Sequence, residues 1–174
     1  MERTGEVAIL YGHIPPGTWN CGEDFSWRFG AIQERFQHVI WLNLFGHTHK
    51  EEFEVVWAFK SNKAVGVNIV SASLTPFTDK NPSFWVITLD KKTLVPLKVE
   101  THFLNLTKAN ALSSSTEPSF EYFHDYISEY GMRDLSPSSF LKLSLSFSSN
   151  WNLAQKYMYN FFVGGFPMNH KFDH

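Results

Sequence analysis

The residues best suited to chemistry are histidines that follow glycines where two apolar runs end. His13 follows Gly12, and His47 and His49 belong to a Gly-His-Thr-His segment. Glycine lets the backbone turn sharply at a strand end, where ligands commonly bind in layered α/β proteins. If this segment is extended, its two imidazoles point to one side, roughly 7 Å apart, toward one metal ion or toward two ions that share a site. His13, on a neighbouring strand, could complete one coordination shell.

Histidines at strand ends also have an ordinary role as hydrogen-bonded structural residues. We expect that role for the five histidines outside these segments: His38, His102, His124, His170 and His174. For His13, His47 and His49, spacing alone leaves the structural and the metal-binding interpretations open.

Short apolar runs predict the strands that position these histidines. The run over 7–11 stops at Gly12-His13, and the run over 39–45 stops at Gly46-His47. Four further strands are expected, the last two as a hairpin: 53–57, 64–72, 84–89 and 95–104.

One helix is predicted between the first two strands, from a cap at Asp24 or Ser26 to about His38. Apolar residues at helical spacing would form its inner face: Phe25, Phe29, Ile32 and Phe36. Charged residues would face outward: Arg28, Glu34 and Arg35. The first 105 residues are thus expected to be mainly strands around one helix.

The composition changes near Ala111, and we expect the remaining chain to be helical. The predicted helices run from Pro118 to Gly131, from a cap at Ser136 onward, and over 151–162. Aromatic residues at spacings of three and four predict a stripe on the first of these helices: Phe120, Tyr122, Phe123, Tyr126 and Tyr130. The stripe could pack against the sheet or approach lipid, and its exposure would separate the two.

Composition excludes several classes of protein. The 174 residues contain 15 Lys plus Arg and 17 Asp plus Glu, so the basic excess of a general nucleic-acid binder is absent. Apolar residues make up 43% and charged residues 18%, which is unlike a disordered chain. The lone cysteine, Cys21, excludes an internal disulfide framework and a cysteine-based zinc site. No signal peptide and no apolar run of transmembrane length is recognised.

The sequence around the histidines resembles the calcineurin-like metallophosphoesterases, and among them the acid sphingomyelinase branch. Residues 12–17 read Gly-His-Ile-Pro-Pro-Gly, and residues 45–49 read Phe-Gly-His-Thr-His, with Glu-Phe at 52–53. The similarity continues through 71–76 and 81–84, and more weakly around Leu135-Ser136-Pro137.

This resemblance implies an α/β fold in which 1–110 form the C-terminal half of a two-sheet metallophosphoesterase domain, followed by a small helical C-terminal subdomain over 111–174. It implies metal-dependent phosphodiester hydrolysis with two divalent ions, Zn²⁺ in this branch. His13 and His47 would bind one ion, and His49 the other. The implied substrate is a phosphodiester, such as a sphingolipid or another choline phospholipid reached at a membrane surface.

The family's other ligands lie in Asp-x-His, Gly-Asp-x-x-Asp and Gly-Asn-His motifs, none of which occurs in these 174 residues. Two zinc ions need about seven protein ligands, so three histidines cannot hold the pair. We therefore expect a chain that supplies only the second set of metal-binding histidines, needs the missing N-terminal half of the domain, and derives from a secreted or lysosomal parent. The alternative is an inactive fragment or pseudoenzyme that binds lipid or protein.

Two sites depart from the pattern of this family, Glu51 and residues 83–85, and a third, Cys21, lies near one of its cysteines. Glu51 stands where the family usually has aspartate, and Ser-Phe-Trp at 83–85 replaces Gly-Tyr-Arg. Phe84 could face a choline-like cation with its ring or could be a core-facing aromatic residue. Cys21 lies near a family cysteine that bonds to an upstream partner, and could equally be a free buried thiol.

Asn105 opens the one sequence triplet suited to glycosylation, which would fit a secreted parent.

Overall fold

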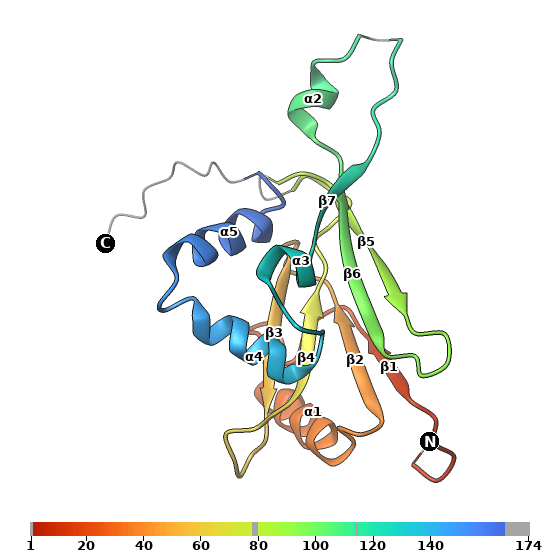
Figure 1. The fold of residues 1–174 in the computed structure, drawn as a ribbon, viewed down its shortest axis with the longest axis vertical. Helices are drawn as coiled ribbons and strands as arrows, with labels where there is room; N and C mark the ends of the chain where they lie inside the picture. Colours follow the sequence, from red (N-terminus) through yellow and green to blue (C-terminus); the bar gives the residue numbers. More distant parts are fainter. Residues whose placement is uncertain (1, 78–79, 114, 166–174) are drawn as a thin grey trace.

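A computed structural model describes residues 2–77, 80–113 and 115–165 and shows a mixed α/β protein with two sheets and several helices (Figure 1). The first sheet, sheet A, has the order β1-β2-β4-β3. Its strands are β1 (Ala8–Tyr11), β2 (Ile40–Phe45), β3 (Glu52–Trp57) and β4 (Ala64–Val70). The strands β1, β2 and β4 run parallel, and β3 is antiparallel to β4. The strand predictions for this part are confirmed.

Sheet B is antiparallel and has the order β5-β6-β7. It consists of β5 (Ser83–Leu89), β6 (Pro96–Phe103) and β7 (Glu121–Asp125). The predicted hairpin of β5 and β6 is confirmed, with Trp85 opposite Thr101. A short helix that the sequence did not predict, α2 (Leu106–Asn110), follows β6.

The helix α1 (Glu23–Arg35) packs on sheet A differently from the prediction. Phe25 is 69% exposed and Ile32 48% exposed, whereas Gln33 is buried. The Gln33 amide donates to the Val65 carbonyl oxygen at 3.1 Å, over Gly66, where a Cβ atom would lie only 2.5 Å from that side chain. A glycine in β4 therefore admits a polar residue. Only part of the predicted apolar stripe, Phe25 and Ile32, is turned toward solvent, whereas Phe29 is half-buried and contacts Phe45.

The expected side-chain cap of α1 is wrong as well. The helix begins after Gly22 without a side-chain cap, so neither Asp24 nor Ser26 serves as one.

The predicted helix over 118–131 is wrong in its first half, because residues 121–125 pair with β6 as strand β7. Only α3 (Tyr126–Tyr130) is helical, and it ends at Gly131 as predicted, in the left-handed conformation with φ 62°. Two helices follow, α4 (Pro137–Ser146) and α5 (Trp151–Phe161). Ser136 caps α4 as predicted, accepting from the Ser139 amide at 3.3 Å.

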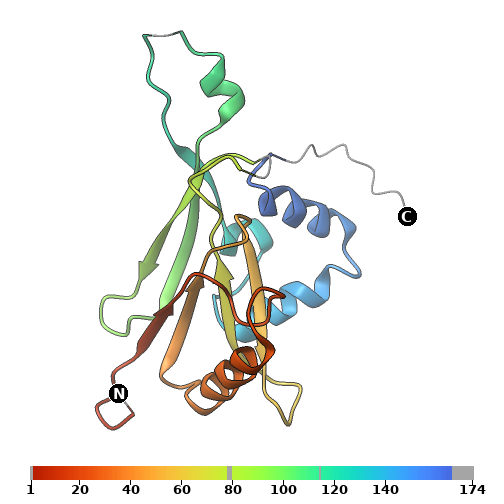
Figure 2. The same cartoon turned by 180° about the vertical axis from the view of Figure 1, so that it is seen from behind.

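One hydrophobic core joins both sheets and the helices. It contains Leu42, Val67 and Ile69 of sheet A, Val99 of sheet B, and side chains of α3 and α4 with their connection, namely Tyr126, Tyr130, Leu135, Phe140 and Leu143. Helices α4 and α1 lie on opposite faces of sheet A, as Figures 1 and 2 show together. The proposed division at residue 110 stays a prediction, and the segments before and after it share this core.

Among the described residues, no helix has the length and apolar character needed to cross a membrane.

Candidate metal site at the ends of two parallel strands

The two Gly-His segments, at 12–13 and 46–49, meet because β1 and β2 are neighbouring parallel strands. Tyr11 of β1 is opposite Leu44 of β2, so both strands deliver their following loops to the same edge of sheet A. The Gly12 amide donates to the Leu44 carbonyl oxygen at 2.9 Å, and the Gly46 amide donates to the His13 carbonyl oxygen at 3.0 Å. The two Gly-His turns are therefore tied to each other through the backbone.

The imidazoles of His13 and His47 face each other at this edge. The Nε2 atom of His13 lies 3.3 Å from the Nδ1 atom of His47, and the rings meet edge to face with their centroids 5.1 Å apart. Two imidazole nitrogens that share a tetrahedral zinc ion at ~2.0 Å each are separated by about 3.3 Å. This part of the donor set therefore fits a metal ion.

His49 lies apart from this pair. The histidine loop, residues 46–51, is not extended, because His47 has φ 77° and His49 has φ 63°. The condition under which both imidazoles would point to one side is thus not met. The His49 ring instead contacts the Phe77 ring edge to face, with centroids 5.8 Å apart.

The Nδ1 atom of His49 is buried without a hydrogen-bond partner. Within the described part of the chain, no three His, Cys, Asp or Glu side chains gather closely enough to hold a metal ion. The described residues therefore supply a fitting pair, His13 and His47, and a separate imidazole with an unpartnered nitrogen, His49.

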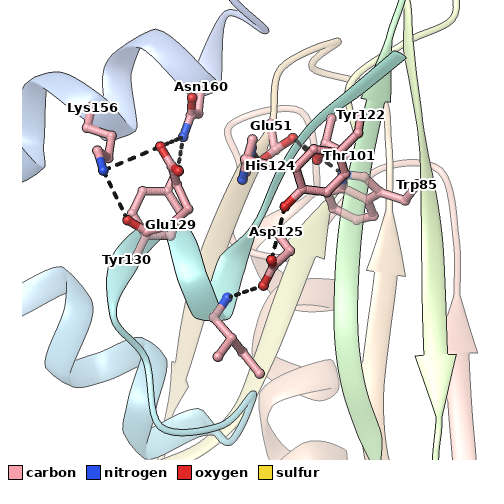
Figure 3. Close-up of polar contacts among 11 residues, drawn as sticks. Glu51, Trp85, Thr101, Tyr122, His124, Asp125, Glu129, Tyr130, Lys156 and Asn160 are labelled. Carbon is pink, nitrogen blue, oxygen red and sulfur yellow. Dashed lines mark hydrogen bonds and ion pairs between the residues drawn. The ribbon is translucent and has the colours of Figure 1, made fainter. Parts of the chain in front are cut away.

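Glu51, at the end of the histidine loop, is fully buried against sheet B (Figure 3). Its Oε1 atom forms an ion-pair contact of 2.7 Å with Nε2 of His124, and its Oε2 atom accepts from the Thr101 hydroxyl at 2.7 Å and from the Trp85 indole N–H at 3.4 Å. Burial by itself disfavours the charged form of His124, but the Glu51 carboxylate outweighs burial and raises the pKa of His124.

The contact between Glu51 and His124 was not predicted. The two residues lie far apart in the sequence, and only the pairing of β6 with β7 brings His124 to the carboxylate. The one available signal was Glu51 itself, a charged residue directly before strand β3.

The Phe77 ring that contacts His49 belongs to a second loop, which is held by a buried lysine. Lys80 is 2% exposed, and its Nζ atom donates to the carbonyl oxygens of Ser73 and Thr75 at 3.1 Å and 2.9 Å. Burial lowers the pKa of Lys80. The loop presents Leu74 and Phe77, which are 64% and 71% exposed. An exposed aromatic side chain, Phe77, therefore lies beside His49.

Phe84 lies on the outer face of sheet B, so the core-facing interpretation is wrong. It is 36% exposed, stacks on His102 with centroids 5.4 Å apart, and meets Phe120 at 5.1 Å. The predicted aromatic stripe is divided: Tyr126 and Tyr130 lie in the core, whereas Phe120 and Tyr122 are 41% and 50% exposed.

Two further sequence predictions concern modification. Asn105 caps α2, and its side-chain oxygen accepts from the Lys108 amide at 3.1 Å; its glycosylation stays a prediction. Cys21 is a free, partly buried thiol.

Two sheets with paired histidines at parallel strand ends define an α/β protein with a candidate metal site. Residues 58–167 match the family described as the acid sphingomyelin phosphodiesterase C-terminal region, and the chain belongs to this family. The resemblance to the acid sphingomyelinase branch is thereby confirmed, and the metallophosphoesterase fold of 1–110 stays a prediction.

Curated relatives match nearly the whole chain. Sphingomyelin phosphodiesterase 2 of Caenorhabditis elegans is 31% identical over 163 residues, which cover 90% of this chain and 26% of that protein. Sphingomyelin phosphodiesterase B of Dictyostelium discoideum is 28% identical, covering 95% of this chain and 27% of that protein. The human sphingomyelin phosphodiesterase is also 28% identical, with 95% and 26% covered. The chain thus spans about a quarter of the length of these relatives.

Proposed function

We propose that this chain forms the C-terminal portion of a metallophosphoesterase domain and supplies its second set of metal-binding histidines for phosphodiester hydrolysis. The observation that carries the proposal is the approach of His13 Nε2 to His47 Nδ1 at 3.3 Å, where two parallel strands end. Membership of the acid sphingomyelinase family supports the same chemistry.

The proposed centre takes two divalent metal ions, Zn²⁺ in the first instance. His13 and His47 would hold one ion and His49 the other, the latter supported by its unpartnered Nδ1 atom. When bound, the ions would supply Lewis acidity toward the phosphoryl oxygens and an activated water nucleophile. The contribution of this chain is to hold the imidazoles in place, each of which binds a metal ion through a nitrogen lone pair.

The remaining ligands would come from the preceding half of the domain. About seven protein ligands are needed for two zinc ions, and this chain offers three. β1 is an edge strand of sheet A in the part of the chain that the structure describes, paired only with β2. We propose that a strand of the preceding half pairs there, which would bring its ligands to the same edge as His13 and His47.

The proposed substrate is a sphingolipid or another choline phospholipid. Relatives that match nine-tenths of this chain carry the name sphingomyelin phosphodiesterase. The exposed Phe77 side chain beside His49 and the exposed Leu74 side chain of the same loop suit contact with a lipid surface. Phe84 is a candidate for contact with the choline group. A secreted or lysosomal parent with a glycan on Asn105 accords with this proposal.

The test is to measure zinc content and phosphodiester turnover of the 174-residue chain, alone and with a polypeptide that carries the three upstream motifs. We expect the chain alone to bind zinc without hydrolysing sphingomyelin, and the mixture to hydrolyse it. His47→Ala should remove turnover from the mixture. Full activity of the chain alone, lost on His47→Ala, would contradict the shared-site proposal.

A second candidate function is a non-catalytic module that binds lipid or protein. It is favoured by the exposed aromatic residues on the outer face of sheet B: Phe84, Phe120 and Tyr122. Absence of zinc binding and of turnover in the mixture, together with binding to sphingomyelin vesicles that Phe84→Ala and Tyr122→Ala weaken, would favour this second candidate.

A further inference from the structure

A buried pair of charged side chains lies directly behind the histidine loop. Glu51 is 1% exposed and His124 is 3% exposed, with 2.7 Å between the carboxylate and the imidazole (Figure 3). The same carboxylate contacts Thr101 of β6 and Trp85 of β5. Because His124 belongs to β7, the last side chain of the histidine loop contacts all three strands of sheet B.

Stability alone explains such a pair poorly. Removing two charges from water costs free energy that their attraction only partly restores, and apolar residues of the same volume often give an equally stable protein. The surroundings add to this cost, since the neighbouring Tyr126 hydroxyl and Nδ1 of His124 are buried without hydrogen-bond partners. What a close contact between two buried charged groups provides beyond stability is a single fixed position for the chain that carries it.

The histidine loop requires such fixing. Its two histidines have φ values of 77° and 63°, which non-glycine residues seldom adopt and which persist only where the surroundings impose them. One end of the loop is held by the Gly46 amide on the His13 carbonyl oxygen. The other end is held at Glu51, whose amide also donates to the Phe161 carbonyl oxygen at 3.0 Å. The imidazoles lie between these two anchors.

We propose that Glu51 and His124 are a positioning pair for the metal site, fixing the directions of the His47 and His49 imidazoles. The pair touches neither the metal nor the substrate and acts through the backbone of the histidine loop. Sheet B and α5 thereby determine the geometry of ligands that emerge from sheet A. This inference rests on the proposed function, in which those two imidazoles bind metal ions.

The deciding variant is Glu51→Gln, which keeps the side-chain shape and removes the charge. Its matched control is Glu129→Gln. Glu129 forms an ion pair with Lys156 at 3.6 Å and accepts from Asn160 at 3.2 Å, so it belongs to the same region but touches no part of the histidine loop. Zinc affinity is measured by competition with a chromophoric chelator. The imidazole ¹H–¹⁵N signals are recorded separately in zinc-free protein.

For Glu51→Gln we expect the zinc dissociation constant to rise at least about tenfold, the effect typical of losing a residue that orients a metal ligand. We also expect the zinc-free imidazole signals of His47 and His49 to shift. In Glu129→Gln the dissociation constant should stay within about twofold of wild type, and the signals should be unchanged.

Equal zinc affinity and equal imidazole signals in both variants would overturn the positioning role. If the wild-type chain binds no zinc even together with the polypeptide that carries the upstream motifs, the proposed function fails, and the zinc-free imidazole signals still decide whether Glu51 positions the loop. If Glu51→Gln does not fold, Thr101→Val decides instead, because it removes only the hydroxyl that donates to Glu51. The expected changes are then smaller but in the same direction, and their absence would contradict the proposal.

Discussion

Two of the close contacts that involve histidine differ in what satisfies the imidazole. His13 and His47 meet at an open strand edge with their nitrogens 3.3 Å apart and no carboxylate beside them in the described part of the chain. His124 lies in the core with the Glu51 carboxylate 2.7 Å away. His13 and His47 can offer nitrogen lone pairs to a bound ligand. The charge of His124 is neutralised by the Glu51 carboxylate of the protein itself.

The comparison shows that burial and the nature of the partner, rather than residue type, separate a ligand site from a structural contact. Two imidazoles without a counter-ion repel each other once both are protonated, so a shared cation is the partner that suits their neutral forms. An imidazole against a buried carboxylate already has a partner of opposite charge. The two pairs should therefore respond differently to substitution, zinc and pH.

The largest expected effect is on the buried pair. His124→Leu leaves the Glu51 carboxylate buried without its partner charge, and loss of one member of a buried ion pair costs about 3–5 kcal/mol of unfolding free energy. Urea denaturation at neutral pH, with a chelator present, measures the loss. The control is His13→Leu at the exposed pair, where a change within about 0.5 kcal/mol is expected. Equal losses in the two variants would remove the distinction.

The next effect belongs to the exposed pair and appears only with metal. Zinc at about 100 times its dissociation constant should raise the unfolding free energy of the wild-type chain by about 2.7 kcal/mol. His47→Ala should abolish this gain. His38→Ala, at an exposed histidine whose imidazole contacts Glu2 instead, should retain it. Thermal unfolding with and without zinc measures all three, and a gain that survives His47→Ala would place the zinc elsewhere.

The strand-end site could be predicted from the sequence because its cause is local. The apolar runs that stop at Gly12 and Gly46 indicate strand ends, and parallel pairing of β1 with β2 brings those ends together. Both signals lie within a few residues of His13 and His47. The backbone conformation of the histidine loop could not be predicted in this way. His47 and His49 both have a left-handed backbone conformation, and His49 therefore points away from the pair.

The buried pair and its surroundings could not be predicted, because pairing between distant segments decides them. Residues 118–131 carry aromatic spacings that suit a helix, but hydrogen bonding to β6 makes 121–125 a strand, and tertiary context overrides the local pattern. That pairing places His124 beside Glu51. The same limit applies to α1, where the missing side chain of Gly66 admits Gln33 and turns Phe25 to solvent.

A pH dependence should distinguish the two pairs further. The net effect of its surroundings raises the pKa of His124: burial opposes the charge, but Glu51, with help from Glu129 and the Asp125 backbone, outweighs it. A raised pKa in the folded state gives stability that is fully present below the unfolded pKa and is lost as pH rises through the folded pKa. The amount is about 1.4 kcal/mol for each unit between the two pKa values.

The wild-type advantage in unfolding free energy over His124→Gln should therefore shrink as the pH rises from 6 to 9, about the ordinary histidine value and beyond it. Urea denaturation in the presence of a chelator gives the difference at each pH. A constant difference across this range would mean that His124 does not carry its charge in the folded protein.

The smallest effect tests whether the exposed pair is structural in the absence of metal. A double-mutant cycle with His13→Ala, His47→Ala and the double variant isolates their coupling. Two exposed neutral imidazoles exchange their mutual contact for contacts with water, so a zinc-free coupling of about 0.5 kcal/mol or less is expected. With zinc, either single variant should lose nearly the whole stabilisation, because both nitrogens are needed for one ion. The coupling should then rise to the size of the zinc effect itself. A zinc-free coupling above about 1.5 kcal/mol, unchanged by zinc, would make the pair of His13 and His47 a structural contact like that of His124 with Glu51.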